Sequence, residues 1–355
     1  MRRKIMKKNL TVLLAATFVA TTILAGCGAS DKAADAAKAD SAATTAAATA
    51  AADAATTAAA PAAGALKFTT GGDQGTYYGF GSVLAGQVSG STDTKVTAIT
   101  SGGSQANIDA LDVGDAELGF VQSDVMAYAY EGTNLFDGAP VTGFSTVAAL
   151  YMEQVQIVTC NPDIKTVADL KGKNVSIGAP GSGVYFNAMD ILGAYGLTES
   201  DINPTYESFG DSADSLQDGK IDAAFITAGA PTTAVTSLST SKDVYLVALD
   251  DEHINKLIET CPYYSKNVIA ADTYNLAGDV STVAVGAVVI ARDDVAEADI
   301  YNFVAGVFDN VDTITTAHAK GAELDLDFAG SVTAVPYHAG AAKYFKEKGI
   351  DVSTK

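Results

Sequence analysis

The sequence predicts an α/β fold of two lobes joined by a hinge of two crossing strands. First, about 290 residues follow an alanine-rich segment, which is more than one compact core usually holds. Second, short apolar runs alternate with Gly/Ser-rich loops and helical segments, a pattern typical of parallel α/β sheets. Third, two apolar runs, 154–159 and 283–290, have the character of strands that cross between lobes.

The N-terminus has the composition of a secretory signal. Residues 2–8 are basic and residues 10–25 are almost wholly apolar. The sequence Leu24-Ala25-Gly26-Cys27 follows and resembles a lipobox. We predict a lipoprotein signal peptide over residues 1–27, with Cys27 diacylated and the protein held on the outer face of a bacterial cytoplasmic membrane. An uncleaved membrane anchor is the alternative, because the apolar run is about long enough to span a bilayer.

Residues 28–65 contain 22 alanines in 38 positions and no larger core-forming side chain. Alanine favours helix, but an isolated helix without packing is marginal. We therefore predict a disordered, Ala/Thr-rich tether that lifts the body off the membrane; the alternative is a structured helical domain.

The body repeats a strand, a small-residue loop and a helix. The expected strands cover residues 66–70, 95–100, 116–121, 154–159, 174–178, 222–227 and 283–290. The expected helices cover residues 76–87, 105–113, 125–131, 184–195, a segment after 231, 296–310, 311–319 and 339–348. Because the chain leaves the first lobe and later returns, we expect lobe I at 66–156 plus 284–355 and lobe II at 157–283.

Charge and composition exclude several function classes. The chain has a net charge of −20, and residues 66–355 carry 15 basic and 38 acidic side chains, a net charge of −23. Such a body repels nucleic acid. Its single arginine, Arg292, excludes arginine clusters that grip anions. Three cysteines exclude a four-cysteine zinc site, and the three histidines form no HxxxH pair, so we expect neither metal nor cofactor.

Three glycine-rich loops, 71–75, 101–104 and 179–183, have the same physical property. Each exposes backbone N–H groups just before a helix, whose N-terminus attracts negative charge. Together they would bind a carboxylate or phosphate without a basic side chain. The plain alternative is that their glycines only close tight turns.

Five blocks carry a resemblance to one family. Residues 70–79 resemble the opening motif of the TAXI family, the solute receptors of tripartite ATP-independent (TRAP) transporters. Similar blocks follow at 101–107 with 118–124, at 167–173 with 176–183, at 218–225 with 229–231, and at 336–341. The match covers essentially all of residues 66–350, in order.

The resemblance implies a type II periplasmic-binding-protein fold that closes around one solute. The family's solutes are mostly small carboxylates of the glutamate/glutamine, 2-oxoglutarate or C4-dicarboxylate class. The implied partner is a TRAP permease in the membrane. A ligand-sensing lipoprotein and a receptor for an ABC importer of amino acids share the fold and stay open.

The resemblance also implies the ligand-binding residues, from two jaws. The first jaw comprises Gly71, Tyr77, Tyr78, Ser104, Gln105, Gln122, Ser123, Asp124 and Glu153. The second comprises Gly181, Ser182, Gly183, Asn187, Gly229, Ala230 and Pro231. The segment before Glu153 lacks the proline often found there in the family, which weakens the assignment of Glu153.

Several of these residues have a structural alternative. Tyr77 and Tyr78 are neighbours at a helix start and cannot face the same way, and we favour Tyr78 for the cleft. Asp124 and Ser182 could be helix caps only.

Other chemically distinctive residues favour structural roles. We expect Arg292 to form a surface ion pair and His338 to pack in the interior. Cys160 and Cys261 are permitted to form a disulfide, but two unpaired cysteines are the alternative.

An enzyme is the least favoured function. Ser239 and Lys242 fit an S-x-x-K motif, but the S-D-N and K-T-G elements of penicillin-recognising enzymes are missing. The chain has no G-x-S-x-G motif, and we predict no catalytic residue.

Overall fold

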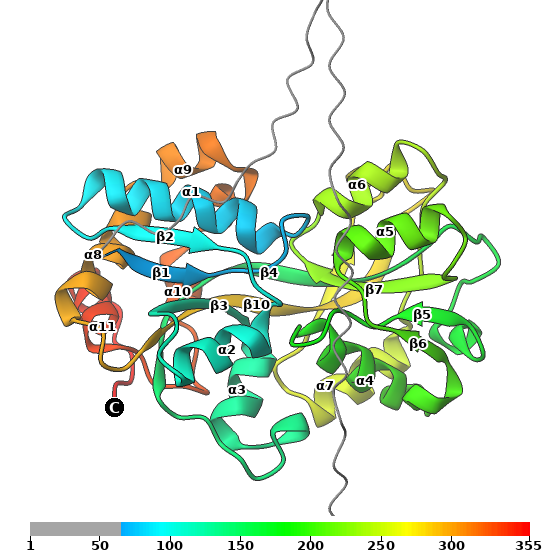
Figure 1. Ribbon diagram of the computed structural model, residues 1–355, viewed down its shortest axis with the longest axis horizontal. Coiled ribbons are helices and arrows are strands. Elements are labelled where there is room, and N and C mark those ends of the chain that lie inside the picture. The colour runs from blue at the N-terminus through cyan, green and yellow to red at the C-terminus, as the bar shows by residue number, and fades with distance from the viewer. Residues whose placement is uncertain (1–64) are drawn as a thin grey trace, which may run out of the picture. The chain divides into compact units, whose positions relative to one another are not determined.

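The computed structural model describes residues 65–355; the predicted signal peptide, Cys27 and nearly all of the predicted tether lie outside them. Figure 1 shows two lobes side by side, with two long strands running through both. The strands are β1 (Leu66–Thr69), β2 (Val96–Ile99), β3 (Leu118–Gln122), β4 (Phe144–Thr159), β5 (Asn174–Ser176), β6 (Asn203–Thr205), β7 (Ala223–Ala228), β8 (Tyr245–Leu246), β9 (Ser265–Ile269) and β10 (Val280–Arg292).

Helices flank these strands in both lobes (Figure 1). The α-helices are α1 (Thr76–Ser91), α2 (Ser104–Asp112), α3 (Ser123–Glu131), α4 (Val184–Ala194), α5 (Phe209–Gln217), α6 (Thr233–Ser239), α7 (Asp251–Thr260), α8 (Glu297–Phe308), α9 (Val311–Ala317), α10 (Leu326–Ala329) and α11 (Ala339–Glu347). The 3-10 helices are η1 (Asn134–Phe136), η2 (Val167–Leu170), η3 (Glu199–Asp201), η4 (Ala271–Thr273) and η5 (Ala319–Glu323).

One sheet of ten strands runs through the described residues, in the order β2-β1-β3-β10-β4-β7-β5-β6, with β8 on β4 and β9 on β10. Pairing is parallel among β1, β2 and β3 and among β5, β6 and β7. It is antiparallel where β10 meets β3 and β4, and where β4 meets β7. The prediction of two parallel units joined by two crossing strands is therefore confirmed.

The crossing strands are buried on both faces, as their apolar composition predicts. Along β10, Val289 faces the core under α1 and α8, whereas Val288 and Ile290 face the core under α2 and α3. Alternate residues point to opposite faces, so one strand serves two cores. In the second lobe, β4 likewise places Ile157 in the core with α4 and α7, and Val158 in the core with α5 and α6.

Sequence reasoning underestimated the first crossing strand. The prediction began it at residue 154, whereas β4 begins at Phe144 and is 16 residues long. The proposed lobe boundaries at residues 156 and 284 both fall inside uninterrupted strands, β4 and β10. These boundaries stay predictions, and the lobes are named below by their elements: β1–β3 with α1–α3 and α8–α11 form the first lobe, and β5–β7 with α4–α7 the second.

Candidate functional site

A cavity of about 100 Å³ lies between the two lobes, large enough for several water molecules or a small solute. Its wall comes from the loops that follow β1, β2, β5 and β6, at residues 71–77, 101–104, 179 with 182–184, and 207–210. Parallel strands end at the same edge of a sheet, so the loops of each lobe meet there. Gln122, Glu153, Thr227 and Ala228 complete the wall.

Four helices begin at this cavity: α1, α2, α4 and α5. The residues that precede three of them, Gly75, Gly103 and Gly183, provide no side-chain cap for the helix. The first backbone N–H groups of a helix have no partner within the helix. The wall therefore presents uncapped N–H groups and the positive ends of helix dipoles, which suits the acid group of a solute.

Glu153 of β4 is the most buried acid in the wall, with 2% of its surface exposed. The Tyr77 hydroxyl donates a hydrogen bond of 2.6 Å to Glu153 Oε2. Burial raises the pKa of Glu153 to about 8, although the Tyr77 hydrogen bond and the positive charge of Lys320 act against this shift. At neutral pH this carboxyl is therefore mostly protonated and can donate a hydrogen bond of its own.

Lys320 of η5 is a buried cation that sequence reasoning missed. Its Nζ pairs with Glu323 Oε1 at 2.5 Å and lies 5.4 Å from the centre of the Tyr151 ring. A Cβ added to Gly229 would lie 2.4 Å from Lys320 Cε. Gly229 follows β7 of the second lobe, so its missing side chain lets the lysine of the first lobe reach the interface behind Glu153.

Three polar atoms of the wall are buried without a hydrogen-bond partner: Ser182 Oγ, Thr227 Oγ1 and Glu207 Oε2. Ser182 and Thr227 have only 7% and 5% of their surface exposed. A buried polar atom without a partner is destabilising, so most such atoms in proteins are paired. All three residues lie in the cavity wall, so their polar atoms are left unsatisfied at this place.

The two lobes touch directly over the cavity. The Ala106 amide of the first lobe donates to the Gly181 carbonyl of the second at 2.9 Å. A Cβ at Gly183 would lie 1.4 Å from Gln122 Oε1, so a side chain at Gly183 is incompatible with this contact. The structure is thus a closed arrangement of the lobes.

A second polar contact between the lobes lies beside the cavity, and we call it the seam. It comprises Asp124 and Tyr128 of α3, Asn187 and Asp190 of α4, and Tyr264. Asn187 Nδ2 donates to Asp124 Oδ2 at 2.8 Å and to Tyr264 Oη at 2.7 Å. Tyr264 and Tyr128 in turn donate to Asp190 Oδ2, at 3.0 and 3.1 Å.

Gln122 joins the seam to the cavity. It lines the cavity, and its Nε2 donates to Asn187 Oδ1 at 2.7 Å. Asp124 is fully buried, and burial followed by the charge of Asp190 raises the pKa of Asp124 to about 7. The seam thus holds a carboxyl that titrates near neutrality.

The structure brings seven of the predicted ligand-binding residues into the cavity wall: Gly71, Tyr77, Ser104, Gln122, Glu153, Ser182 and Gly183. It places Asp124 and Asn187 in the seam instead. Seven others do not line the cavity: Tyr78, Gln105, Ser123, Gly181, Gly229, Ala230 and Pro231. Some of these have local partners: the Ser123 hydroxyl accepts from the Gly286 amide, and the Ala230 amide donates to Gln154 Oε1.

The structure places Tyr77, and not the preferred Tyr78, in the cavity wall. Tyr77 lines the cavity and stacks on Phe120, with ring centres 4.6 Å apart, whereas Tyr78 is half-buried outside the wall. Adjacent residues on a helix point about 100° apart, so only one of them follows the strand end into the interface. The apolar floor made by Phe120 selects Tyr77, and this packing could not be read from the local sequence.

The structural alternatives for other residues are resolved. Ser182 does not cap α4, whose N-cap is Gly183. Arg292 forms a surface ion pair with Asp294 at 2.5 Å, and His338 is buried, with its ring beside the Val295 carbonyl. Cys160 and Cys261 are unpaired.

Within residues 65–355, no group of three or more His, Cys, Asp or Glu side chains is placed to hold a metal ion. Over the same range, none of the helices is both long enough and apolar enough to cross a membrane.

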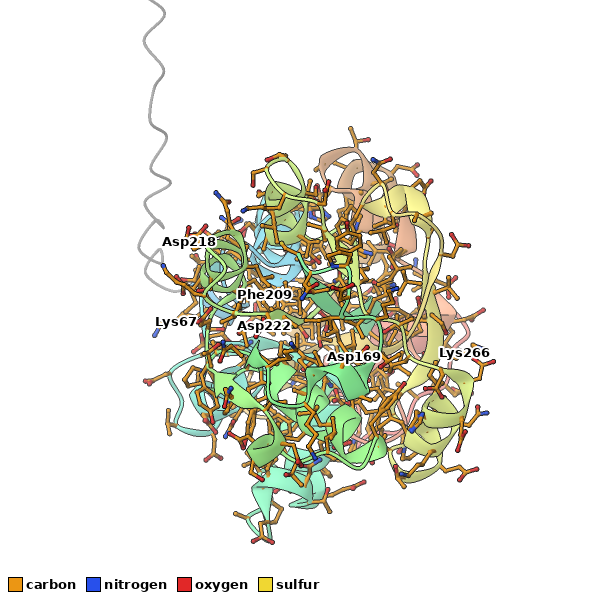
Figure 2. The ribbon with its side chains drawn as sticks, turned by 90° about the vertical axis from the view of Figure 1, so that its right-hand side faces the viewer. Lys67, Asp169, Phe209, Asp218, Asp222 and Lys266 are labelled. Atoms are coloured by element: carbon orange, nitrogen blue, oxygen red, sulfur yellow. The ribbon has the colours of Figure 1, made fainter. Side chains whose placement is uncertain are left out.

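Sequence reasoning missed one whole part of the wall, residues 207–210. The strand before it, β6, has three residues and contains Pro204, so no run of apolar residues signals it. Phe209 packs its ring 3.3 Å from where a Cβ on Gly75 would lie, which brings this loop against the first lobe. Figure 2, which looks onto the second lobe, shows Phe209 within the body, whereas Lys67 and Lys266 lie at its margins.

The chain matches the model of the NMT1-like family over residues 68–349, most of its length, and so belongs to that family.

Solved structures share the fold. MatC from Rhodopseudomonas palustris, solved with bound malate, aligns with a TM-score of 0.52 and 14% identity, over 80% of this chain and 96% of MatC. The aliphatic sulphonate binding protein SsuA from Escherichia coli gives a TM-score of 0.43 and 20% identity, over 80% and 90% of the two chains. A Salmonella typhimurium periplasmic binding protein with high arginine specificity aligns with a TM-score of 0.44 and 15% identity, over 73% of this chain and 98% of that protein. The predicted two-lobed periplasmic-binding-protein fold is confirmed.

Proposed function

We propose that this member of the NMT1-like family is an extracytoplasmic receptor that takes a small carboxylate solute into the cavity between its lobes. The observation that carries the proposal is the wall itself. Three helices begin there without side-chain caps, and Ser182 and Thr227 present hydroxyls that have no partner in the protein. Hydrogen bonds from such donors to a charged acceptor contribute about 1.5–3 kcal/mol each.

The acidity of the body restricts how the acid group is held. Residues 66–355 have a net charge of −23, but charges separated by more than about 8 Å are largely screened at physiological salt. Backbone N–H and hydroxyl donors act at bonding distance, where screening matters little. MatC, which shares the fold and is described with malate bound, supports the choice of a carboxylate.

The remaining parts of the proposal rest on the sequence. The TAXI-like blocks favour a TRAP permease as the membrane partner, and the lipobox favours anchoring through Cys27 at the outer face of the cytoplasmic membrane. Closure of the lobes would bury the solute and form the surface that docks on the permease. We propose binding and delivery without catalysis.

A thermal-shift panel on the full-length protein, purified in mild detergent, tests the proposal. We expect at least one small carboxylate to raise the melting temperature by several degrees, because a solute that binds only the folded state stabilises it. Native mass spectrometry of the same sample identifies any solute that co-purifies. A clear shift from a sugar or peptide, with none from any carboxylate, would overturn the carboxylate assignment.

A further inference from the structure

The charged side chains in the cavity wall, Asp73 and Glu207, are of one sign, and Glu153 is mostly neutral at neutral pH. Asp73, Glu153 and Glu207 line the cavity, whereas no lysine, arginine or histidine lines it. A solute whose only charged groups are carboxylates would bring negative charge against Asp73 and Glu207. The helix N-termini favour one acid group, but they leave the acidic part of the wall without a complement.

Glu207 is the acid of the cavity wall that has a buried oxygen without a hydrogen-bond partner. Its Oε2 atom is buried and accepts no hydrogen bond from the protein. The pKa of Lys220 is raised first by its hydrogen bond to Asp218, at 2.8 Å, and last by the charge of Glu207, so Lys220 is engaged by another acid. An ionised carboxylate oxygen can only accept hydrogen bonds, so its complement is a donor, and a cationic donor fits best.

Asp73 and Glu207 approach the cavity from opposite lobes. Asp73 lies in the loop after β1, and Glu207 lies in the loop after β6. These loops touch, because a Cβ on Gly210 would lie 3.2 Å from Gln74 Cγ, and Phe209 packs on Gly75. A cation at this edge of the cavity would therefore be held by both lobes at once.

The wall consequently has two chemical sides. Ser182 and Thr227, both more than nine-tenths buried, line the same cavity and have unpartnered hydroxyls, and uncapped helix starts add N–H donors. Asp73 and Glu207 add acceptors. This arrangement complements a molecule that carries a negative and a positive group a few bonds apart.

We propose that the solute carries a protonated amine in addition to its acid group, and that Glu207 is the specificity-determining residue that accepts a hydrogen bond from this amine. The inference rests on the proposed function and narrows it to small zwitterions. Asp73 adds attraction from the opposite lobe.

Isothermal titration of the full-length protein in mild detergent, with solutes matched in carbon skeleton, tests the inference. Glutamate is compared with 2-oxoglutarate, and aspartate with succinate. We expect the amine-bearing member of the better-bound pair to bind at least 10-fold more tightly. In Glu207→Gln we expect affinity for that amine to fall about 10- to 100-fold, since a charge-assisted hydrogen bond is lost. Affinity for its amine-free counterpart should change less than 3-fold or rise.

Glu259→Gln is the matched control, because it removes one negative charge from an exposed position of the same lobe outside the cavity. It should leave both affinities unchanged. Equal or tighter binding of the amine-free solutes, or an equal effect of Glu207→Gln on both classes, would overturn the inference while leaving the proposed receptor of carboxylates intact. Binding of diamines such as putrescine, with no carboxylate bound, would overturn the proposed carboxylate class but support the amine.

Discussion

The cavity and the seam are two polar regions buried between the same lobes, and they differ in how complete they are. In the seam, the amide of Asn187 and the hydroxyls of Tyr128 and Tyr264 all find partners within the protein. In the cavity wall, Ser182, Thr227 and Glu207 each keep a polar atom without one. With the exception of Asp124 Oδ1, the seam is therefore satisfied within the protein, whereas the cavity wall keeps three unpartnered polar atoms.

This difference separates two roles that a binding protein must combine. On the proposed function, the seam would stabilise the closed arrangement whatever solute is bound, and the cavity would decide which solute that is. One seam atom, Asp124 Oδ1, is buried without a partner, which fits a carboxyl whose pKa of about 7 keeps it partly protonated. Substitutions in the two regions should thus change solute binding in distinguishable ways.

The largest effect is expected in the cavity. Ser182→Asp places a carboxylate where the uncapped loop should meet the acid group of the solute, so affinity should fall by more than about 100-fold, because an uncompensated buried charge is strongly unfavourable. Isothermal titration measures the loss, and circular dichroism checks that the variant stays folded. Ser182→Ala, the control, should weaken binding by only about 10-fold. Retained affinity in Ser182→Asp would remove this residue from the site.

A smaller loss is expected in the seam. Asn187→Leu leaves Gln122, Asp124 and Tyr264 without their shared partner, and each unsatisfied group destabilises the closed arrangement by about 1–3 kcal/mol. Affinity should fall about 10- to 100-fold for every solute alike, with a larger radius of gyration in small-angle scattering. The exposed Asn203→Leu is the control. A loss confined to one solute class would contradict a role in closure.

Breaking the contact between Gly183 and Gln122, which joins the cavity to the seam, should weaken solute binding less than the substitutions above. Gly183→Ala forces Gln122 away from its position, because the added Cβ would lie 1.4 Å from Gln122 Oε1. A glutamine side chain can rotate, so we expect about a 10-fold loss of affinity at the scale of one broken hydrogen bond. Gly193→Ala, on the same helix with no atom within 4 Å of its added Cβ, should leave binding unchanged. Isothermal titration measures the affinity of both variants. An equal loss of affinity in Gly183→Ala and Gly193→Ala would refute a role for the close contact with Gln122.

A separate effect concerns how the stability of the fold depends on pH, to which both regions contribute. The pKa values of Glu153 and Asp124 are raised to about 8 and about 7 in the folded protein. The folded state therefore binds the protons of these two acids more tightly than the unfolded chain does. Their stabilisation is complete below their unfolded pKa values near 4 and is lost as pH rises toward 7–8. Melting temperature should therefore fall between pH 5 and 8. Glu153→Gln and Asp124→Asn should each flatten part of that fall.

The groups around the two acids set the slope of this pH dependence. Tyr77 and Lys320 face Glu153, and Asp190, Asn187 and Tyr264 face Asp124. Scanning calorimetry in buffers of matched ionic strength measures the slope. The exposed Asp214→Asn, in the second lobe, should leave it unchanged. A wild-type melting temperature that rises from pH 5 to 8 would contradict the assigned pKa shifts.

The sequence predicted the fold well because the fold depends on local patterns. Apolar runs such as 283–290, with a glycine-rich loop after most of the others, follow from side-chain period and turn chemistry. The same logic located Gly71, Ser104 and Ser182 in loops at strand ends, where the structure places the cavity.

The rest of the site depends on contacts between distant segments. Lys320 lies in a short 3-10 helix and reaches the interface only because Gly229, more than ninety positions earlier, has no side chain. Glu207 follows a proline-containing strand of three residues that has no recognisable pattern. The sequence analysis predicts that Asp124 and Asn187 bind the solute, but in the structure α3 and α4 bring the two side chains into a hydrogen bond with each other.

The continuous sheet has a consequence for how the protein unfolds. The β4 and β10 strands pair along most of their length and serve the cores of both lobes. Neither lobe can lose its central strands without disrupting the other, so the two should melt in one cooperative transition rather than as separate domains. In calorimetry this would appear as a single peak whose van't Hoff and calorimetric enthalpies agree.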